Sequence, residues 1–275
     1  MRGVSRLPVG LPAFVALLLM VSSFGCGESG VDGATVIHST VGGLDLSGTY
    51  LRSDSSTRGP TMLLLHETGP THSRFDFDPI WETLAQAGYN LVAPDLRSHG
   101  LSEAGGTHEE LAYSSDGYPE DVRGWLQFIA DRADAGDPLD RDRVGILGLG
   151  SSASIAAAAL GKEYVGCAVA VSPSIAEINA FEDGFLRPGE IADDLDGPPE
   201  PDAIIELSED VSLHTTRWMV SVGDEPSATD GPVLHAATEE PSSLYEESGA
   251  FHGTELLMLS EDNRRAMVEW CLDKL

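Results

Sequence analysis

The chain has 275 residues, of which 41% are hydrophobic and 22% charged, a composition that fits one large globular domain. Its formal net charge is -29, from 45 Asp and Glu residues against 16 Lys and Arg residues. A surface this acidic repels phosphate backbones, so nucleic acid is not expected as a partner. The acidic residues are dispersed rather than gathered in a tail, which predicts a protein kept soluble by its charge.

The first 25 residues have the layout of a secretory signal. Arg2 and Arg6 form a positive start, and an apolar run from Leu11 to Val21 follows. This run is shorter than a comfortable membrane span. Residues 1–25 are therefore expected to be a signal peptide and not part of the fold.

The end of this signal resembles the lipobox of bacterial lipoproteins. Gly25 stands directly before Cys26, although Ser23 replaces the usual Leu three places before the cysteine. The resemblance implies that Cys26 is lipidated and that residues 26–34 form a short tether. We therefore expect an exported protein of the cell envelope, anchored to the membrane by lipid. A plain cleaved signal and an uncleaved anchor are the alternatives.

The remaining cysteines carry no evident site chemistry. Cys167 lies in an apolar run and Cys271 in a terminal helix pattern, so both are expected to be buried small hydrophobes rather than a disulfide. No pair of cysteines has metal-ligand spacing. No metal and no cofactor is expected.

From Thr35 onward, short apolar runs alternate with helix-like stretches. A hairpin is expected from Val36–Val41 and Leu44–Leu51. Further strands are predicted at Thr61–His66, Tyr89–Asp95, Arg143–Leu147, Gly166–Val171, Arg217–Val222 and around Leu244, and helices at Pro79–Ala87, Asp121–Arg132, Ser152–Leu160 and Arg264–Leu272. This alternation predicts an α/β domain over residues 35–275, with a mostly parallel sheet of about eight strands and helices on both faces.

One segment interrupts the pattern. Residues 175–211 are rich in Asp, Glu, Pro and Gly and have few apolar residues. A long irregular segment in a compact domain is usually a lid or a binding loop. We therefore expect an acidic loop or lid there.

Two loops carry family motifs. A strand ends in His66-Glu67-Thr68-Gly69, and the next ends in Asp95-Leu96-Arg97-Ser98-His99-Gly100-Leu101-Ser102. The chain resembles the α/β-hydrolase family, in which the first loop opens with His-Gly and supplies an oxyanion N–H, and the second reads D-x-R-G-H-G-x-S. The resemblance implies structural roles for Arg97 and His99. It places Thr68 at the oxyanion site, together with Glu67, which stands where the family has glycine.

The nucleophile is expected after the strand that ends at Leu147. The family motif G-x-S-x-G forms a strained strand-to-helix turn. Without a gap, Gly148 takes the first glycine position and Gly150 the nucleophile position, while Ser152 replaces the second glycine beside the oxyanion site. On that register the covalent nucleophile is absent and Ser151 begins a helix. Sliding the turn by one residue instead puts Ser151 at the nucleophile position.

The acid and the base are expected later in the chain. Asp224, or its neighbour Glu225, follows a late strand and fits the acid. His252 lies in His252-Gly253-Thr254, which resembles a loop of dienelactone-hydrolase-like members. Other histidines, among them His72, are expected at the surface. The resulting order of nucleophile, acid and base is that of the α/β-hydrolase fold.

Two functions compete on these residues. One is a hydrolase that acts on small-molecule ester or acyl substrates with weak or degenerate machinery built from Ser151, Asp224 and His252. The other is a catalytically inactive α/β-hydrolase-like protein that binds a ligand at the cell envelope. The residue at the nucleophile position, Gly150 or Ser151, discriminates between them.

Overall fold

The computed structural model describes most of the predicted domain. The described residues are 32–53, 58–107, 110–111, 114, 116–161, 164–184, 213–224 and 226–275. The signal segment, Cys26, Glu225 and most of the acidic segment therefore lie outside the described residues.

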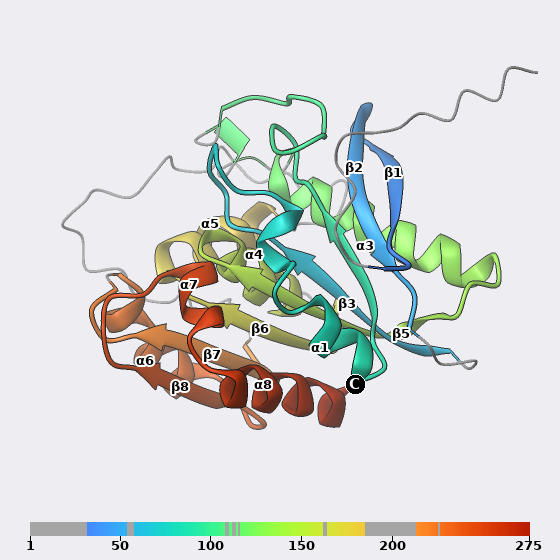
Figure 1. Cartoon of the computed structure of the whole chain (residues 1–275). Helices are drawn as coiled ribbons and strands as arrows, with labels where there is room; N and C mark the ends of the chain where they lie inside the picture. The colour runs from blue at the N-terminus through green and yellow to red at the C-terminus, as the bar shows by residue number, and fades with distance from the viewer. Residues whose placement is uncertain are drawn as a thin grey trace, which may run out of the picture.

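The elements alternate along the chain as the apolar runs predict (Figure 1). The strands are β1 (Thr35–Val41), β2 (Leu44–Leu51), β3 (Gly59–Leu65), β4 (Asn90–Pro94), β5 (Leu139–Leu149), β6 (Cys167–Val171), β7 (Thr216–Ser221) and β8 (Ser243–Glu247). The helices are η1 (Arg74–Phe77), α1 (Trp81–Gln86), α3 (Tyr118–Asp134), α4 (Ser151–Gly161), α5 (Ile175–Gly184), α6 (Ser227–Ala237), α7 (Gly253–Met258) and α8 (Glu261–Lys274).

The strands form one eight-stranded sheet in the order β1-β2-β4-β3-β5-β6-β7-β8. The β1–β2 and β2–β4 pairs are antiparallel, and every pair from β4 through β8 is parallel. This confirms the predicted α/β-hydrolase fold. Because the strands from β3 to β8 run in one direction, the loops that follow them gather at one edge of the sheet.

Both faces of the sheet are covered, since alternate residues of each central strand enter different core clusters. On β5, Ile146 packs with the α3 and α4 side, while Leu147 packs with the α1, α7 and α8 side. Trp218 of β7 packs with residues of α4, α5 and α6. Cys167 and Cys271 are free and buried on the α1 and α8 side, which confirms that they do not form a disulfide.

The acidic segment begins differently from its prediction. Residues Ile175–Gly184 form helix α5, whereas an irregular chain was expected from residue 175. Ile175, Ile178 and Phe181 recur three residues apart and are buried, so they attach α5 to the core despite the polar residues between them. Residues 185–211 lie outside the described residues.

Candidate active site

The turn between β5 and α4 is built around two glycines. A Cβ added at Gly148 would lie 1.9 Å from the carbonyl oxygen of Ser152, so only glycine fits there. Gly150 has a φ of +56°, in the left-handed region, and stands between the last residue of β5 and the first residue of α4. The structure therefore places Gly150, and not Ser151, at the turn.

Ser151 is the first residue of α4, and its hydroxyl has another partner. Its Oγ donates a hydrogen bond of 2.9 Å to Oε1 of Glu177 on α5. Ser154 donates to the other oxygen of Glu177 at 3.1 Å. Burial raises the pKa of Glu177, although both hydroxyls oppose this rise. Among the described contacts of Ser151, none joins its hydroxyl to His252.

Asp224 and His252 lie in direct contact. Asp224 follows β7, and His252 caps the N-terminus of α7. His252 Nδ1 and Asp224 Oδ2 are 2.7 Å apart, and Ser227 also donates to the same Asp224 oxygen at 2.7 Å. The carboxylate thus holds the imidazole by Nδ1 and leaves Nε2 facing the turn. The structure brings together these two residues, which lie 28 positions apart in the chain.

Glu67 takes the place that a nucleophile side chain would fill. Its Oε1 lies 3.2 Å from His252 Nε2. A Cβ added at Gly150 would lie 2.7 Å from both Cγ and Cδ of Glu67. The carboxylate, which comes from the loop after β3, therefore occupies the space in front of Gly150.

These contacts change the protonation of His252. The hydrogen bond with Glu67 is the largest cause that raises the pKa of His252 to about 9; burial opposes it and Asp224 adds to it. The imidazole is therefore a cation at neutral pH and donates toward both carboxylates. A cationic imidazole has no lone pair with which to take a proton from a serine.

A second imidazole lies on the far side of Glu67. His72 Nε2 is 3.9 Å from Glu67 Oε2, and His72 Nδ1 is 2.8 Å from Asp76 Oδ2. Burial raises the pKa of Asp76, and its contact with His72 lowers it. His72 was expected at the surface; its side chain is 31% exposed, and its imidazole also lies beside Glu67. In the sequence, the sign of a paired His72 is Asp76, four residues further on.

Buried imidazoles fix the loop that carries Glu67. His66 Nδ1 donates to the Glu67 carbonyl at 2.7 Å, and His66 Nε2 accepts from the Leu96 N–H at 3.1 Å. Burial lowers the pKa of His66 to about 3, which keeps the ring neutral as this pairing requires. Ser152 Oγ donates to the His66 carbonyl at 2.6 Å. Ser152 thus binds His66, the residue that follows β3. Thr68, two residues after His66, is buried.

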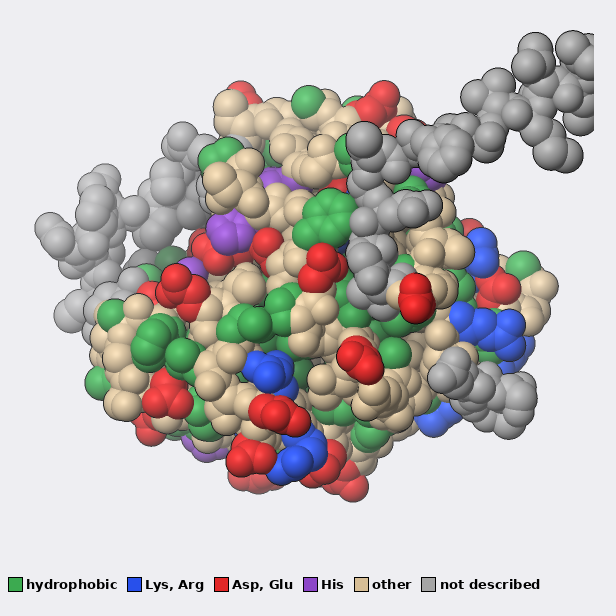
Figure 2. Space-filling model, viewed as in Figure 1, with side chains coloured by type: hydrophobic (Ala, Val, Ile, Leu, Met, Phe, Trp, Pro, Cys, Tyr) green, Lys and Arg blue, Asp and Glu red, His purple; other side chains and the backbone are tan. Residues whose placement is uncertain are grey.

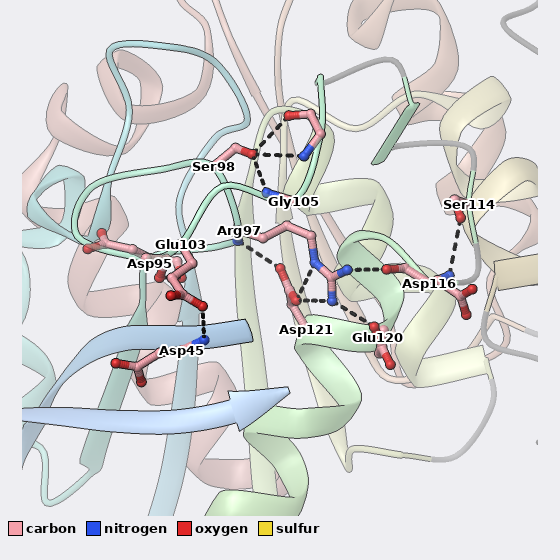
Figure 3. A network of polar contacts seen from close by, with 12 residues as sticks. Asp45, Asp95, Arg97, Ser98, Glu103, Gly105, Ser114, Asp116, Glu120 and Asp121 are labelled. Carbon is pink, nitrogen blue, oxygen red and sulfur yellow. Dashed lines mark hydrogen bonds and ion pairs between the residues drawn. The ribbon is translucent and has the colours of Figure 1, made fainter. Parts of the chain in front are cut away.

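The second family loop supports the first. His99 Nε2 accepts from the Gly69 N–H at 3.0 Å, and His99 Nδ1 donates to the Arg97 carbonyl at 2.9 Å. Figure 3 shows the Arg97 guanidinium directed at the start of α3, where it pairs with Asp121 and Glu120. These contacts give His99 and Arg97 structural positions, as the motif resemblance implies.

Glu177, like His72, is a site residue that the sequence did not predict. It lies in the segment expected to be irregular, where an isolated glutamate gives no signal. Within the described residues, no group of three or more His, Cys, Asp or Glu side chains is arranged to hold a metal ion. None of the described helices is long and apolar enough to span a membrane.

Comparisons with known proteins agree with this fold. The family model described as the alpha/beta hydrolase family matches residues 62–270. The esterase Pf2001 of Pyrococcus furiosus is 18% identical, with a TM-score of 0.62 over 88% of this chain and 92% of that one. DcsB, solved in complex with its substrate analogue, is 15% identical, with a TM-score of 0.64 over 88% of this chain and 100% of that one.

A third similar structure is EstE1, a thermostable carboxylesterase from a metagenomic library. It is 14% identical, with a TM-score of 0.61 over 90% of each chain. No curated protein sequence matches this chain. The family match covers most of the chain, and the chain belongs to the α/β-hydrolase family.

Proposed function

We propose that this chain is a hydrolase of small-molecule ester-type substrates with a degenerate serine-hydrolase site and weak turnover. The observation that carries the proposal is the position of Glu67. Its carboxylate fills the space in front of Gly150 and pairs with His252, the residue that would otherwise serve the nucleophile. The Asp224–His252 pair and the oxyanion-side loop remain, so acid–base chemistry and charge stabilisation persist without a covalent step.

Several features support an ester-type substrate. The printed names of two structurally similar proteins describe an esterase and a carboxylesterase. The loop His252-Gly253-Thr254 adds a resemblance to dienelactone-hydrolase-like members of the family. Since a fold hosts many functions, the substrate class rests on the geometry of the site together with these likenesses.

A second candidate function is ligand binding without turnover. It is favoured by the charge state of His252, which is held as a cation between Glu67 and Asp224 at neutral pH. In this case the ion pairs of His252 with Glu67 and Asp224 stabilise the loops of the site, and the protein uses the fold for recognition alone.

The proposal includes export and a lipid anchor at Cys26. It is supported by Arg2, Arg6, the apolar run after them and the Gly25-Cys26 pair. Replacing Cys26 with Ser should move the protein from the membrane fraction to the soluble fraction or leave the precursor uncleaved. Unchanged fractionation and unchanged mass would overturn the anchor.

The test of function uses a small chromogenic ester together with a fluorophosphonate probe. We expect slow hydrolysis above the uncatalysed rate and no labelling, because among the described residues the contacts of His252 go to Glu67 and Asp224 and to no serine hydroxyl. The matched variant is Ser151→Ala, which should leave the slow hydrolysis in place. Labelling and fast turnover that both vanish in Ser151→Ala would identify an ordinary serine hydrolase instead. Binding of the ester without any turnover would select the second candidate.

A further inference from the structure

Because position 150 has no hydroxyl, the imidazole of His252 faces the carboxylate of Glu67 instead of a serine. Glu67 Oε1 and His252 Nε2 lie 3.2 Å apart, and the two side chains are 20% and 42% exposed. We propose that Glu67 is the general base and His252 the general acid of a direct attack by water on the ester, with no covalent intermediate. This inference rests on the proposed hydrolase function.

Among the described carboxylates of the site, Glu67 is the one that lies in front of Gly150, where a nucleophile would stand, and its side chain is 20% exposed. Asp224 is held by His252 and by a serine hydroxyl, Glu177 accepts from two serine hydroxyls, and Asp76 pairs with an imidazole. Glu67 has one ion pair at 3.2 Å and a longer contact of 3.9 Å on its other oxygen. That second oxygen is therefore the one able to accept a proton from water.

His252 is suited to give a proton rather than to take one. Its pKa of about 9, raised first by Glu67 and further by Asp224, keeps the imidazole protonated at neutral pH. Glu177 of α5 also interacts electrostatically with His252, and the His72–Asp76 pair lies on the far side of Glu67. In a serine hydrolase the imidazole first acts as a base. In the proposed mechanism it acts as an acid from the first step, and Glu67 is the base.

The proposed cycle balances in protons and bonds. Water oxygen attacks the acyl carbon and its proton passes to Glu67, which gives a tetrahedral oxyanion. The bond from carbon to the leaving oxygen then breaks, and His252 Nε2 gives its proton to that oxygen, which releases the alcohol. The acid product leaves, and Glu67 returns its proton to His252 across the 3.2 Å contact. Both groups then have their starting protonation.

The variant that tests the base is Glu67→Gln, which keeps the shape and removes the proton acceptor. We expect hydrolysis of p-nitrophenyl acetate by the full-length protein to fall about 10²-fold or more, the usual contribution of a general base. The matched control is Glu82→Gln on the exposed face of α1, which should keep the natural rate. Circular dichroism and thermal unfolding of each variant establish that it is folded.

The pH profile of the unmodified protein is an independent readout, which needs no variant. After subtraction of the uncatalysed rate, turnover of ethyl acetate should fall as pH rises through about 9, because His252 loses the proton that the departing ethoxide oxygen requires. If His252 served as a base, turnover would instead rise through the same pH. Whether turnover falls or rises through this pH therefore reports the role of His252, and a merely structural role for Glu67 would not decide between the two.

The outcomes separate the two proposals. A natural protein that hydrolyses no ester contradicts the hydrolase function and this inference with it. Hydrolysis that is unchanged in Glu67→Gln, or that rises through pH 9, overturns the inference and leaves the hydrolase function standing. Single turnover in ¹⁸O-labelled water gives a third readout: label found in Glu67 by mass spectrometry would show a carboxylate nucleophile, and the proposal requires that none is found.

Discussion

At the scale of single residues, the position of Glu67 decides the chemistry of the site. In a serine hydrolase, a neutral imidazole faces a hydroxyl, whereas here a cationic imidazole faces a carboxylate. Gly150 contributes no side chain, and Ser151 gives its hydroxyl to Glu177 on another helix. Two contacts and the missing side chain at position 150 therefore set the candidate site apart from the motif that the neighbouring loops retain.

Restoring the nucleophile should require two substitutions. We expect Gly150→Ser alone to give no fluorophosphonate labelling, because the new side chain would meet Glu67 at about the 2.7 Å found for an added Cβ. The double variant Gly150→Ser with Glu67→Gly removes that obstacle and the main cause that raises the pKa of His252. It should be labelled and should regain part of the ~10⁶-fold contribution that a serine nucleophile makes in subtilisin.

The control for this experiment is Glu67→Gly alone, which should not be labelled because position 150 still has no side chain. Labelling of Gly150→Ser without the second change would mean that Glu67 moves aside easily. In that case the carboxylate would not be a fixed part of the site.

At the scale of secondary-structure elements, α5 packs on the core and carries a site residue, although its sequence predicted an irregular segment. It packs on α4 through Ile175, Ile178 and Phe181, and it carries the Glu177 carboxylate to the hydroxyl of Ser151. The loops after β3 and β4 are likewise joined by the buried imidazoles of His66 and His99. The groups around His252 are therefore held by elements that are far apart in the chain.

The contribution of α5 is measurable through its central apolar residue. Ile178 is fully buried among residues of α4, α6 and β7, so Ile178→Ala should lower the free energy of unfolding by about 2–5 kcal/mol. Denaturant titration provides the value. The control Val233→Ala, on a half-exposed side chain of α6, should change stability by no more than about 0.5 kcal/mol. Equal effects of the two substitutions would refute the assigned packing of α5.

At the scale of the whole molecule, the negative net charge and the position of the site both influence the charge state of the site. The net charge is -29, and Figure 2 shows the acidic side chains spread over the visible face rather than gathered in one block. The site lies where the parallel strands end, so its carboxylates gather within this already negative molecule. Such a field favours cations, and it favours the charged form of His252.

The stability of the protein should therefore depend on pH through His252. The pKa of this residue is raised from its ordinary 6.5 to about 9 on folding, so its contribution is fully present below about pH 6.5. That contribution is lost as pH rises through about 9. Urea unfolding between these pH values should show a decrease in stability that is smaller in His252→Gln. Parallel curves for the two proteins would contradict the raised pKa.

The sequence by itself determined the features that depend on local patterns. Alternating apolar runs predicted the eight strands and four of the eight described helices, α1, α3, α4 and α8. The motifs after β3, β4 and β7 placed the loops at one edge, because parallel strands end together. The glycines at 148 and 150 favoured the register that leaves the turn without a serine. Only the tertiary structure decided where Glu67, Glu177 and His72 point, since their contacts join residues that lie far apart in the chain. A carboxylate shows its partner only when folding removes it from water and brings an imidazole or a hydroxyl within hydrogen-bond distance.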